Sequence, residues 1–387
     1  MRARPTVALA LAAAALVAGC GRAAPAARGP AAWAPPGGAP FLATSLATRA
    51  GTRADVVMGG SVASENNFWQ LFTRPAGTST WTLVTPPGTA DNGGLVLAGG
   101  GAQSLITGFR PSQGLTYTPL AITRNDGRAW SSAGPLDAAL ADVPDALAAA
   151  PGSGNLLALL TDGTAEQATP GYTSWTTLAT QRTLAATSPG RRCGLQNLTA
   201  ATLTPTGTPL LGGTCSHPGT TGIFARTGRT WRAAGPALPA AVSGQHVQVL
   251  RLTSTPGGTI ALLTAGTGSA ASLLGAWSSD GGSHWILSPP LRLTGAAPSS
   301  ASFGPGGTAA IISTAGRAEI ITGAGSSWRS LPPLPPGTAT LAPGPGGAAD
   351  ALAVHRGTLT IWHLTPGGTA WAKAQAINVP IQYGSSS

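Results

Sequence analysis

Few side chains in this 387-residue chain are of types that could carry out chemistry. Only 12 residues are acidic, and three of them, Asp137, Asp142 and Asp145, fall in one short stretch. Carboxylates this close together could hold Ca²⁺, but a Ca²⁺ loop places Asp or Asn at alternate positions and ends in a bidentate Glu. The stretch has neither feature. We therefore expect a solvated acidic loop here rather than a calcium site.

The histidines do not form a metal site either. No two of them lie two or four positions apart, the spacings that would place two imidazoles on one face of a strand or helix to bind zinc. The Gly-rich turns precede strands rather than helices, so they are not phosphate loops. We expect no metal and no cofactor. The histidines are His217, His246, His284, His355 and His363.

Two polar stretches share the spacing Ser/Thr-x-Asp/Asn-x-Gly-x-x-Trp. They are Ser278, Asp280, Gly282 and Trp285 in one stretch, and Thr123, Asn125, Gly127 and Trp130 in the other. In a tight turn, Asp or Asn can accept bonds from backbone N–H groups, Gly can take a positive φ, and Trp remains free to pack. The pattern predicts structural turns. The alternative is a direct ligand role for Asp280 and Trp285.

Tryptophan recurs in the chain about every 48 residues, a period typical of repeat architectures. A Pro-x-Gly turn keeps phase with it and opens an apolar run at Pro151, Pro205, Pro256, Pro305 and Pro345. The repeating tryptophans are Trp81, Trp130, Trp175, Trp231, Trp285, Trp328 and Trp371. Two markers in constant phase indicate one repeated structural unit.

Each repeat contains four short candidate strands. In the clearest one they cover residues 247–252, 259–263, 271–277 and 284–287, separated by Gly- and Pro-rich turns. Such β-branched and apolar runs between turn residues are typical of strands. No segment shows sustained helical periodicity with caps; residues 136–150 come nearest, and Pro144 interrupts them. The chain is therefore predicted to be all-β.

The two polar stretches resemble the Asp-box, or BNR repeat, of sialidase-like β-propellers, and the other repeats keep only Gly and Trp or Trp alone. The resemblance implies a seven-bladed β-propeller over residues 41–387, with six blades as the alternative. Each blade would be a four-stranded antiparallel sheet. In that family the boxes are structural and lie away from the ligand face. We expect the tail, residues 377–383, to pair with the first blade and close the ring.

The same resemblance raises the possibility of glycoside hydrolysis. Sialidases of this architecture use an arginine triad, a Tyr–Glu nucleophile pair and an Asp acid/base. Phe109-Arg110-Pro111 comes near the family's Arg-x-Pro motif but lacks the intervening residue, and the triad maps onto no blade. The candidates for the nucleophile pair are Tyr117, Tyr172, Tyr383, Glu65, Glu166 and Glu319. We therefore expect no catalytic residues, with exo-sialidase activity as the alternative.

The N-terminus has the pattern of an export signal. Two arginines precede an apolar run, residues 7–17, which is too short to span a bilayer. Leu16-Val17-Ala18-Gly19-Cys20 resembles a bacterial lipobox, which implies a signal peptide at residues 1–19 and acyl chains, such as palmitate, on Cys20. An ordinary secretory leader is the alternative. Residues 20–40, rich in Ala, Pro and Gly, would then form a flexible tether.

Cysteine usage agrees with export. Only Cys193 and Cys215 remain besides Cys20, and both fall in strand-like segments. An even pair outside the cytoplasm suggests a disulfide, which would contribute about 3 kcal/mol in the loop-entropy model. The alternative is two buried thiols.

Charge gives little indication of partners. The net charge of +10 is spread over the chain, and no run of basic residues exceeds two, so we expect no nucleic-acid binding. We expect a monomeric, lipid-anchored, extracytoplasmic module that binds a protein or glycan through its loops. The alternative for each candidate residue is an ordinary polar loop position. These candidates are Glu65, Asp91, Arg110, Arg191, Arg192 and His217.

Overall fold

Nearly all regular structure among the described residues is β-strand. The computed structural model describes residues 43–47, 53–61, 66–75, 78–86, 94–99, 105–110, 116–293, 298–355 and 358–378. All of them belong to one unit, Trp33–Ser387. Cys20 and the predicted leader and tether lie outside the described residues.

Two four-stranded sheets open the described chain, and each is an antiparallel meander in sequence order. The first contains β1 (Ala43–Ala47), β2 (Arg53–Ser61), β3 (Asn66–Arg74) and β4 (Thr82–Leu83). The second contains β5 (Gly94–Gly99), β6 (Leu105–Arg110), β7 (Thr118–Thr123) and β8 (Ser131–Leu136).

Three further four-stranded sheets follow the same pattern. One contains β9 (Leu147–Ala149), β10 (Leu156–Leu159), β11 (Thr164–Ala168) and β12 (Trp175–Thr180). Another contains β22 (Ser300–Phe303), β23 (Ala309–Ile312), β24 (Ala318–Ile321) and β25 (Arg329–Ser330). The last contains β26 (Thr338–Pro343), β27 (Ala349–His355), β28 (Thr358–Leu364) and β29 (Ala372–Asn378).

Between them lies a nine-stranded sheet made of two meanders. The first is β13 (Leu195–Leu203), β14 (Pro209–Cys215), β15 (Ile223–Thr227) and β16 (Thr230–Ala233). The second is β17 (Val247–Thr255), β18 (Gly258–Ala265), β19 (Ser272–Ser278), β20 (Ile286–Leu287) and β21 (Leu291–Arg292). A single residue pair, Thr214 with Gln248, joins β14 to β17.

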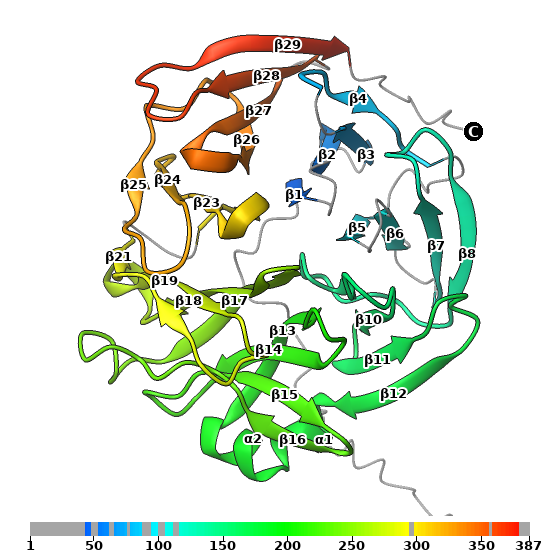
Figure 1. The fold of residues 1–387 in the computed structure, drawn as a ribbon, viewed down its shortest axis with the longest axis vertical. Coiled ribbons are helices and arrows are strands. Elements are labelled where there is room, and N and C mark those ends of the chain that lie inside the picture. The colour runs from blue at the N-terminus through cyan, green and yellow to red at the C-terminus, as the bar shows by residue number, and fades with distance from the viewer. Residues whose placement is uncertain are drawn as a thin grey trace, which may run out of the picture. The chain divides into compact units, whose positions relative to one another are not determined.

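The first strands of successive meanders follow one another around a common centre (Figure 1). β1 contacts β5, β5 contacts β9, β9 contacts β13, β13 contacts β17, β22 contacts β26, and β26 contacts β1. β17 reaches the next sheet at η3 (Pro305–Gly307), one of the predicted Pro-x-Gly turns. This arrangement is a β-propeller with four-stranded blades, so the predicted fold class is confirmed at that level.

The predicted pairing of the tail with the first sheet is wrong for the residues that can be compared. Ile377 and Asn378 belong to β29 and pair with Leu359 and Thr358 of β28 in their own sheet. The rest of the predicted segment, residues 379–383, lies outside the described residues. The first sheet already has four strands from its own sequence, so it needs no strand from the tail.

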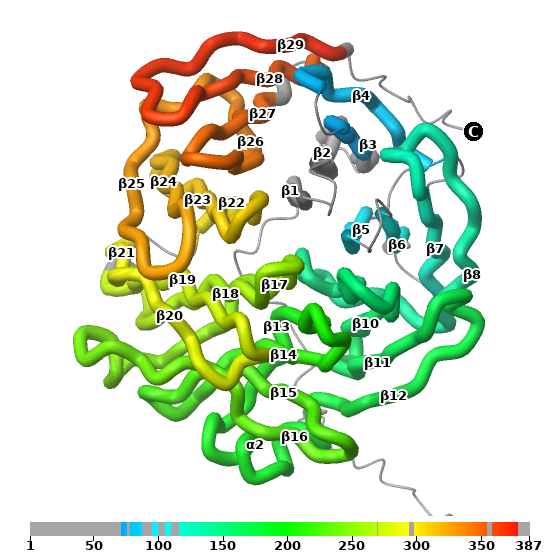
Figure 2. Tube along the Cα trace, viewed as in Figure 1, coloured from blue at the N-terminus to red at the C-terminus, as the bar shows by residue number. Residues whose placement is uncertain are grey.

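Side chains instead join the first and last sheets, which lie side by side as the blue and red ends of Figure 2. The Gln375 amide accepts from Trp81 N at 2.9 Å and donates to Trp81 O at 2.8 Å. The Asp350 carboxylate lies 3.1 Å from Arg74 Nη1 and 2.7 Å from His363 Nδ1. A hydrophobic cluster also spans the two sheets. Polar and apolar contacts together hold this seam.

Two short helices, not predicted, connect β12 to β13. They are α1 (Gln181–Ala185), capped by the Thr180 side chain, and α2 (Ser188–Cys193), capped by Thr187. Gly194 ends α2 with a φ of 62°. Cys193 therefore ends a helix and does not lie in a strand as expected. Both helices are too short to show a hydrophobic period, although Thr187, Pro189 and Gly194 are the start and stop signals of a helix.

The predicted acidic loop is only partly correct. Asp137 and Asp142 are exposed, but Asp145 is only 7% exposed and does not lie in a solvated loop. It precedes β9, the first strand of its sheet, and so lies at the centre of the ring rather than on its rim. The spacing of the three acids carried no information about this position because the partner of Asp145 is distant in sequence.

That partner is Arg251, in the middle of β17 and 4% exposed. Arg251 Nε and Nη2 both donate to the Asp145 carboxylate, with N···O distances of 2.7–3.0 Å, and Leu252 N donates to Asp145 Oδ2 at 2.8 Å. Arg251 Nη1 donates to the Ala301 carbonyl in β22, and its guanidinium lies 5.6 Å from the centre of the Phe303 ring. One buried ion pair therefore connects β9, β17 and β22.

We expect Asp145→Ala to lower the free energy of unfolding by about 3–5 kcal/mol, because it leaves the Arg251 guanidinium buried and unpaired. Arg251→Met should be comparably destabilising. The double variant should lose much less than the sum of the two, since it removes both charges. Urea denaturation of the wild type and the three variants measures this coupling, with the exposed Arg317→Met as control. Additive losses would show that the two side chains do not depend on each other.

Candidate binding surfaces

The turn at residues 278–285 is held by the Asp280 carboxylate. Asp280 Oδ1 accepts from Ser283 N at 3.0 Å, His284 N at 2.9 Å and Ser278 Oγ at 2.9 Å. Ser278 Oγ in turn accepts from Gly282 N at 2.8 Å. Gly282 has a φ of +86°, and a Cβ there would lie 3.0 Å from the Ala234 carbonyl oxygen. This is the turn chemistry expected from the sequence.

The turn at residues 123–130 repeats these bonds with an amide in place of the carboxylate. Asn125 Oδ1 accepts from Ala129 N at 2.8 Å and from Thr123 Oγ1 at 2.9 Å. Thr123 Oγ1 accepts from Gly127 N at 3.0 Å. A Cβ on Gly127 would lie 2.6 Å from Val84, so glycine is required by space as well as by its positive φ. The two turns are structurally equivalent.

The tryptophans that end these turns bind the preceding meander. Trp130 Nε1 donates to the Val84 carbonyl at 2.7 Å, and Trp285 Nε1 donates to the Ala234 carbonyl at 2.6 Å. Trp371 and Trp328 make corresponding bonds to Pro332 O and Ser288 Oγ. The Asp and Asn side chains thus bond within their own turns, and the tryptophans bond across the seam to the neighbouring sheet.

The remaining repeat tryptophans lie at seams without this bond. Trp175 and Trp231 pack against the large core cluster of the β5–β16 region, and Trp81 lies in the cluster of the first and last sheets. The indole N–H groups of Trp81 and Trp175 are buried with no acceptor among the described residues. Packing of the ring against a hydrophobic cluster, rather than the indole hydrogen bond, is what these repeats have in common.

The described residues contain no arrangement suited to sialidase chemistry. Tyr172 is buried, its hydroxyl donates to the Gly154 carbonyl at 3.0 Å, and burial raises its pKa. Tyr117 is exposed, whereas Glu166 and Glu319 accept from Thr and Ser hydroxyls of the neighbouring strands. In the described part of the chain, no tyrosine hydroxyl bonds to a glutamate.

The described cavity where β5, β9, β13, β17 and β22 meet is too small for a substrate. The cavity around Asp145 and Arg251 is lined by residues of β5, β9, β13, β17 and β22 and has a volume of about 50 Å³. Ligand sites usually have volumes of about 300–1,000 Å³, so this space holds a few water molecules but no sugar ring. Its one described carboxylate is fully engaged by the arginine.

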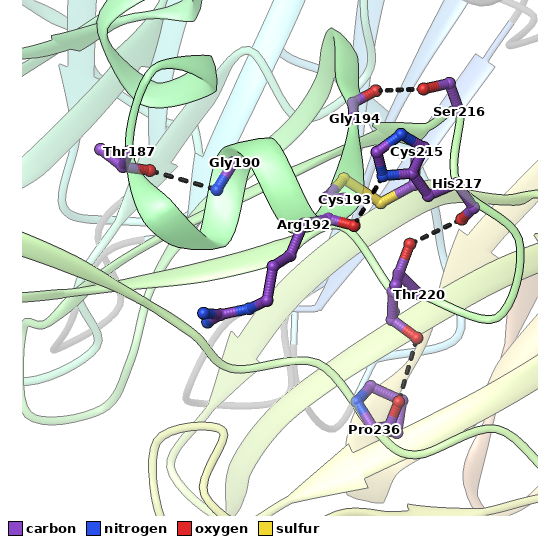
Figure 3. Close-up of a disulfide and its surroundings, with 11 residues drawn as sticks. Thr187, Gly190, Arg192, Cys193, Gly194, Cys215, Ser216, His217, Thr220 and Pro236 are labelled. Atoms are coloured by element: carbon purple, nitrogen blue, oxygen red, sulfur yellow. Dashed lines mark hydrogen bonds between the residues drawn. A yellow bond between two sulfur atoms is a disulfide. The ribbon is translucent and has the colours of Figure 1, made fainter.

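Two of the predicted ligand residues, Arg192 and His217, lie beside the disulfide (Figure 3), and Arg191 precedes Arg192 in α2. Cys193 and Cys215 are bonded, with their Cα atoms 4.8 Å apart, which confirms the predicted bridge. His217 Nδ1 lies 3.0 Å from the Arg192 carbonyl oxygen, and Arg192 Nη1 donates to Ser188 Oγ at 2.9 Å. The bridge and these bonds fix α2 to the β14–β15 loop.

We call this region the knob: residues 181–194 together with residues 216–222. Arg182, Arg191, Arg192 and His217 are exposed on it, and it contains no Asp or Glu. Arg182 was not among the predicted ligand residues, because nothing in the sequence placed α1 beside α2. The knob is a disulfide-braced surface whose only formal charges are positive.

The other predicted ligand residues cannot be placed with it. Glu65 and Asp91 lie outside the described residues, and Arg110 is described only as the last residue of β6. Among the described residues, no group of three or more His, Cys, Asp or Glu side chains could hold a metal ion. In the same part of the chain, no helix has the length and apolar character needed to cross a membrane.

Comparisons with known proteins find similarity in solved structures only. No protein-family model matches the chain, and no curated protein matches it. A six-bladed β-propeller lectin from Aleuria aurantia is 15% identical over 89% of this chain and 96% of its own, with a TM-score of 0.40. TolB from Acinetobacter baumannii is 10% identical over 83% of this chain and 63% of its own, with a TM-score of 0.43.

A third structure, a PL25 ulvan lyase, is 16% identical over 75% of this chain and 80% of its own, with a TM-score of 0.44. Identity and score are low in all three. The fold therefore rests on the pairing and order of this chain's own strands.

The Asp280 turn should make the stability of the folded protein depend on pH in the acidic range. Hydrogen bonds from the His284 backbone and side chain, and then from Ser278 and Ser283, hold the Asp280 pKa below its ordinary value. A carboxylate with a lowered pKa stabilises the fold above its ordinary pKa, and this contribution is lost as the pH falls through the folded-state value. We expect Asp280→Asn to have a lower Tm than wild type at pH 7, with a difference that shrinks below about pH 4.

Asn125→Asp is the matched control, since a carboxylate there would accept the equivalent bonds from Thr123 and Ala129 and should introduce an acid dependence in that turn. Circular dichroism melts between about pH 2 and pH 7 cover the range in which the carboxylate titrates. A difference between Asp280→Asn and wild type that stays constant over this range would contradict the assignment.

Proposed function

We propose that this chain is a lipid-anchored, extracytoplasmic β-propeller that binds an acidic protein or glycan and does not catalyse a reaction. The observation that supports the absence of catalysis is the Asp145–Arg251 pair, which neutralises the carboxylate in the small cavity where β5, β9, β13, β17 and β22 meet. Propeller enzymes of the sialidase type need free acids and a nucleophile at that place. Binding then falls to the outer surfaces.

The proposal includes a ring of seven blades. The nine-stranded sheet is held together by one residue pair between two meanders, Thr214 with Gln248, so we count β13–β16 and β17–β21 as separate blades. The five four-stranded sheets of the described residues complete the seven. We also assign residues 123–130 and 278–285 to the Asp-box type, on the strength of their shared hydrogen bonds.

Anchoring rests on the sequence. We propose that residues 1–19 are removed as a signal peptide, that Cys20 carries the acyl chains, and that residues 20–40 tether the propeller of residues 41–387. Two or more acyl chains bind a membrane stably, whereas one binds reversibly. The Cys193–Cys215 disulfide supports an oxidising compartment, where such bonds persist.

The knob is the surface we propose for binding a macromolecular partner. Three exposed arginines and a histidine without a neighbouring acid in the segment favour a partner that presents carboxylates or other anions. The disulfide contributes about 3 kcal/mol by restricting the unfolded chain and keeps this surface ordered before binding.

Cys20→Ala should move the protein from the membrane fraction to the soluble extracytoplasmic fraction, because the acyl chains have no other attachment site. Fractionation followed by immunoblotting measures this, and labelling with radioactive palmitate reports the modification itself. Cys193→Ser/Cys215→Ser is the control and should stay with the membrane. A Cys20→Ala protein that remains in the membrane fraction would refute the anchor.

Partner capture tests the knob. The full chain with its anchor is crosslinked on cells and purified, and its partners are compared with those of Arg191→Gln/Arg192→Gln. We expect this variant to capture at least tenfold less of the partner than wild type does, because two charge-assisted contacts are removed. Arg229→Gln/Arg317→Gln removes two exposed charges elsewhere and should capture as wild type does.

Equal capture by both double variants would exclude the knob as the binding surface. Turnover of a fluorogenic sialoside by the purified chain, abolished by Tyr117→Phe, would instead favour the sialidase alternative.

A further inference from the structure

A polar groove lies at the other end of the strands from the knob. β13 begins beside Gly194 in the knob and runs nine residues to Leu203, so the two ends are roughly 25–30 Å apart. At the far end, β11 and β12, the turn at residues 206–208 and the β15–β16 hairpin enclose a volume of about 610 Å³. That volume is within the range of ligand sites, about 300–1,000 Å³.

The groove is lined by hydrogen-bonding side chains that have no protein partner. They come from both meanders, and within the described residues none of them makes a side-chain hydrogen bond or ion pair. Ser and Thr hydroxyls and a Gln amide can each both donate and accept. These side chains are Gln167, Thr169, Ser174, Thr176 and Thr208.

One charge faces this set. Arg226 Nε donates to the Gly228 carbonyl at 3.0 Å, which orients the guanidinium, and the two terminal nitrogens donate to no described residue. No acidic residue lines the groove. A guanidinium held in one orientation with free nitrogens is suited to bidentate contact with a carboxylate or sulfate.

The lining argues against a peptide ligand. Sites that bind proteins and peptides rely on large apolar anchors; no aromatic residue lines this groove, and its apolar residues other than glycine are Ala168, Leu178 and Pro209. Closely spaced hydroxyl and amide groups instead match a ligand with many hydroxyls of its own. A polyhydroxylated ligand that also bears an anionic group is a saccharide containing a uronic acid or a sulfate ester.

A second groove, between the β17–β21 meander and the β22–β25 sheet, has the opposite character. It measures about 490 Å³, includes the corresponding turn of the following sheet at Gly306 and Gly307, and is walled by Trp277, Trp285 and Ile286. Ile286 is 58% exposed there. The fold thus provides grooves at two seams, and the first is polar because of its side chains. The second groove serves as a control site.

We propose that the groove between β11–β12 and the β13–β16 meander binds an acidic saccharide. Arg226 pairs with the carboxylate or sulfate, and the hydroxyl and amide groups of Gln167, Thr176 and Thr208 bind the sugar hydroxyls. The proposal extends the proposed function by adding a site and a ligand class, and it does not depend on the knob.

Isothermal titration calorimetry of the full chain in detergent tests this with three probes of equal length: tetragalacturonate, a sulfated galactan tetramer and a neutral galactan tetramer. We expect one or both acidic probes to bind at least tenfold more tightly than the neutral one, with affinity falling as salt increases. The carboxylated and sulfated probes distinguish the two sources of the anionic group.

Variants locate the site. Arg226→Gln should weaken binding of the acidic probe at least tenfold, Arg226→Lys should retain part of it, and Thr176→Val/Thr208→Val should weaken it through the sugar hydroxyls. Ile286→Ser in the second groove and Arg191→Gln/Arg192→Gln in the knob should bind as wild type does.

Three results would overturn the proposal: no binding of either acidic probe, equal binding of the neutral probe, or loss of binding in the knob variant but not in Arg226→Gln. The last would indicate nonspecific attraction to the basic knob. Failure here leaves the capture experiment on the knob unaffected, so the two proposals are tested separately.

Discussion

The Asp145–Arg251 ion pair is the interaction on which the rest of the structure depends. Two charges removed from water cost several kcal/mol each unless their geometry and remaining hydrogen bonds are well satisfied. Here Arg251 Nε and Nη2 donate to the Asp145 carboxylate, which also accepts a hydrogen bond from Leu252 N. The remaining guanidinium nitrogen, Nη1, donates to the Ala301 carbonyl. These contacts require β9, β17 and β22 to meet at the centre of the ring.

This constraint decides where function can be. The cavity around the neutralised ion pair has a volume of about 50 Å³, below the usual range of ligand sites, so we place ligand binding at the ends of the strands. The two surfaces we single out lie at opposite ends of β13. One is a basic knob braced by the disulfide, and the other is a polar groove between two meanders. The knob is formed by connections, whereas the groove combines the outer strands of one meander with a turn and a hairpin of the next.

The sequence predicted the features that are local and repeated. Tryptophan spacing and Pro-x-Gly turns located the meanders, and the hydrogen bonds of Asp280 and Asn125 follow from residues within one turn. The disulfide followed from cysteine number and compartment. In each case the interacting residues are either close in sequence or few enough to pair without ambiguity.

Features that depend on distant residues could not be predicted. Arg251 is 106 positions from Asp145, so the spacing of the acids suggested a solvated loop instead of a buried pair. The link between Gln375 and Trp81 spans 294 positions, and a tail strand was expected in its place. The polar lining of the groove comes from two meanders, so it could be recognised only once the two meanders were placed side by side. Helices α1 and α2 were missed because they are too short to show a period.

Native-state hydrogen exchange at Leu252 tests the central claim most directly. Its amide donates to Asp145 inside the ring, so we expect it to exchange only through global unfolding, in the slowest class of the molecule. Amides of the outer strand β16 (Thr230–Ala233) should exchange faster through local opening. Exchange at Leu252 as fast as in β16 would contradict a closed, ion-paired centre.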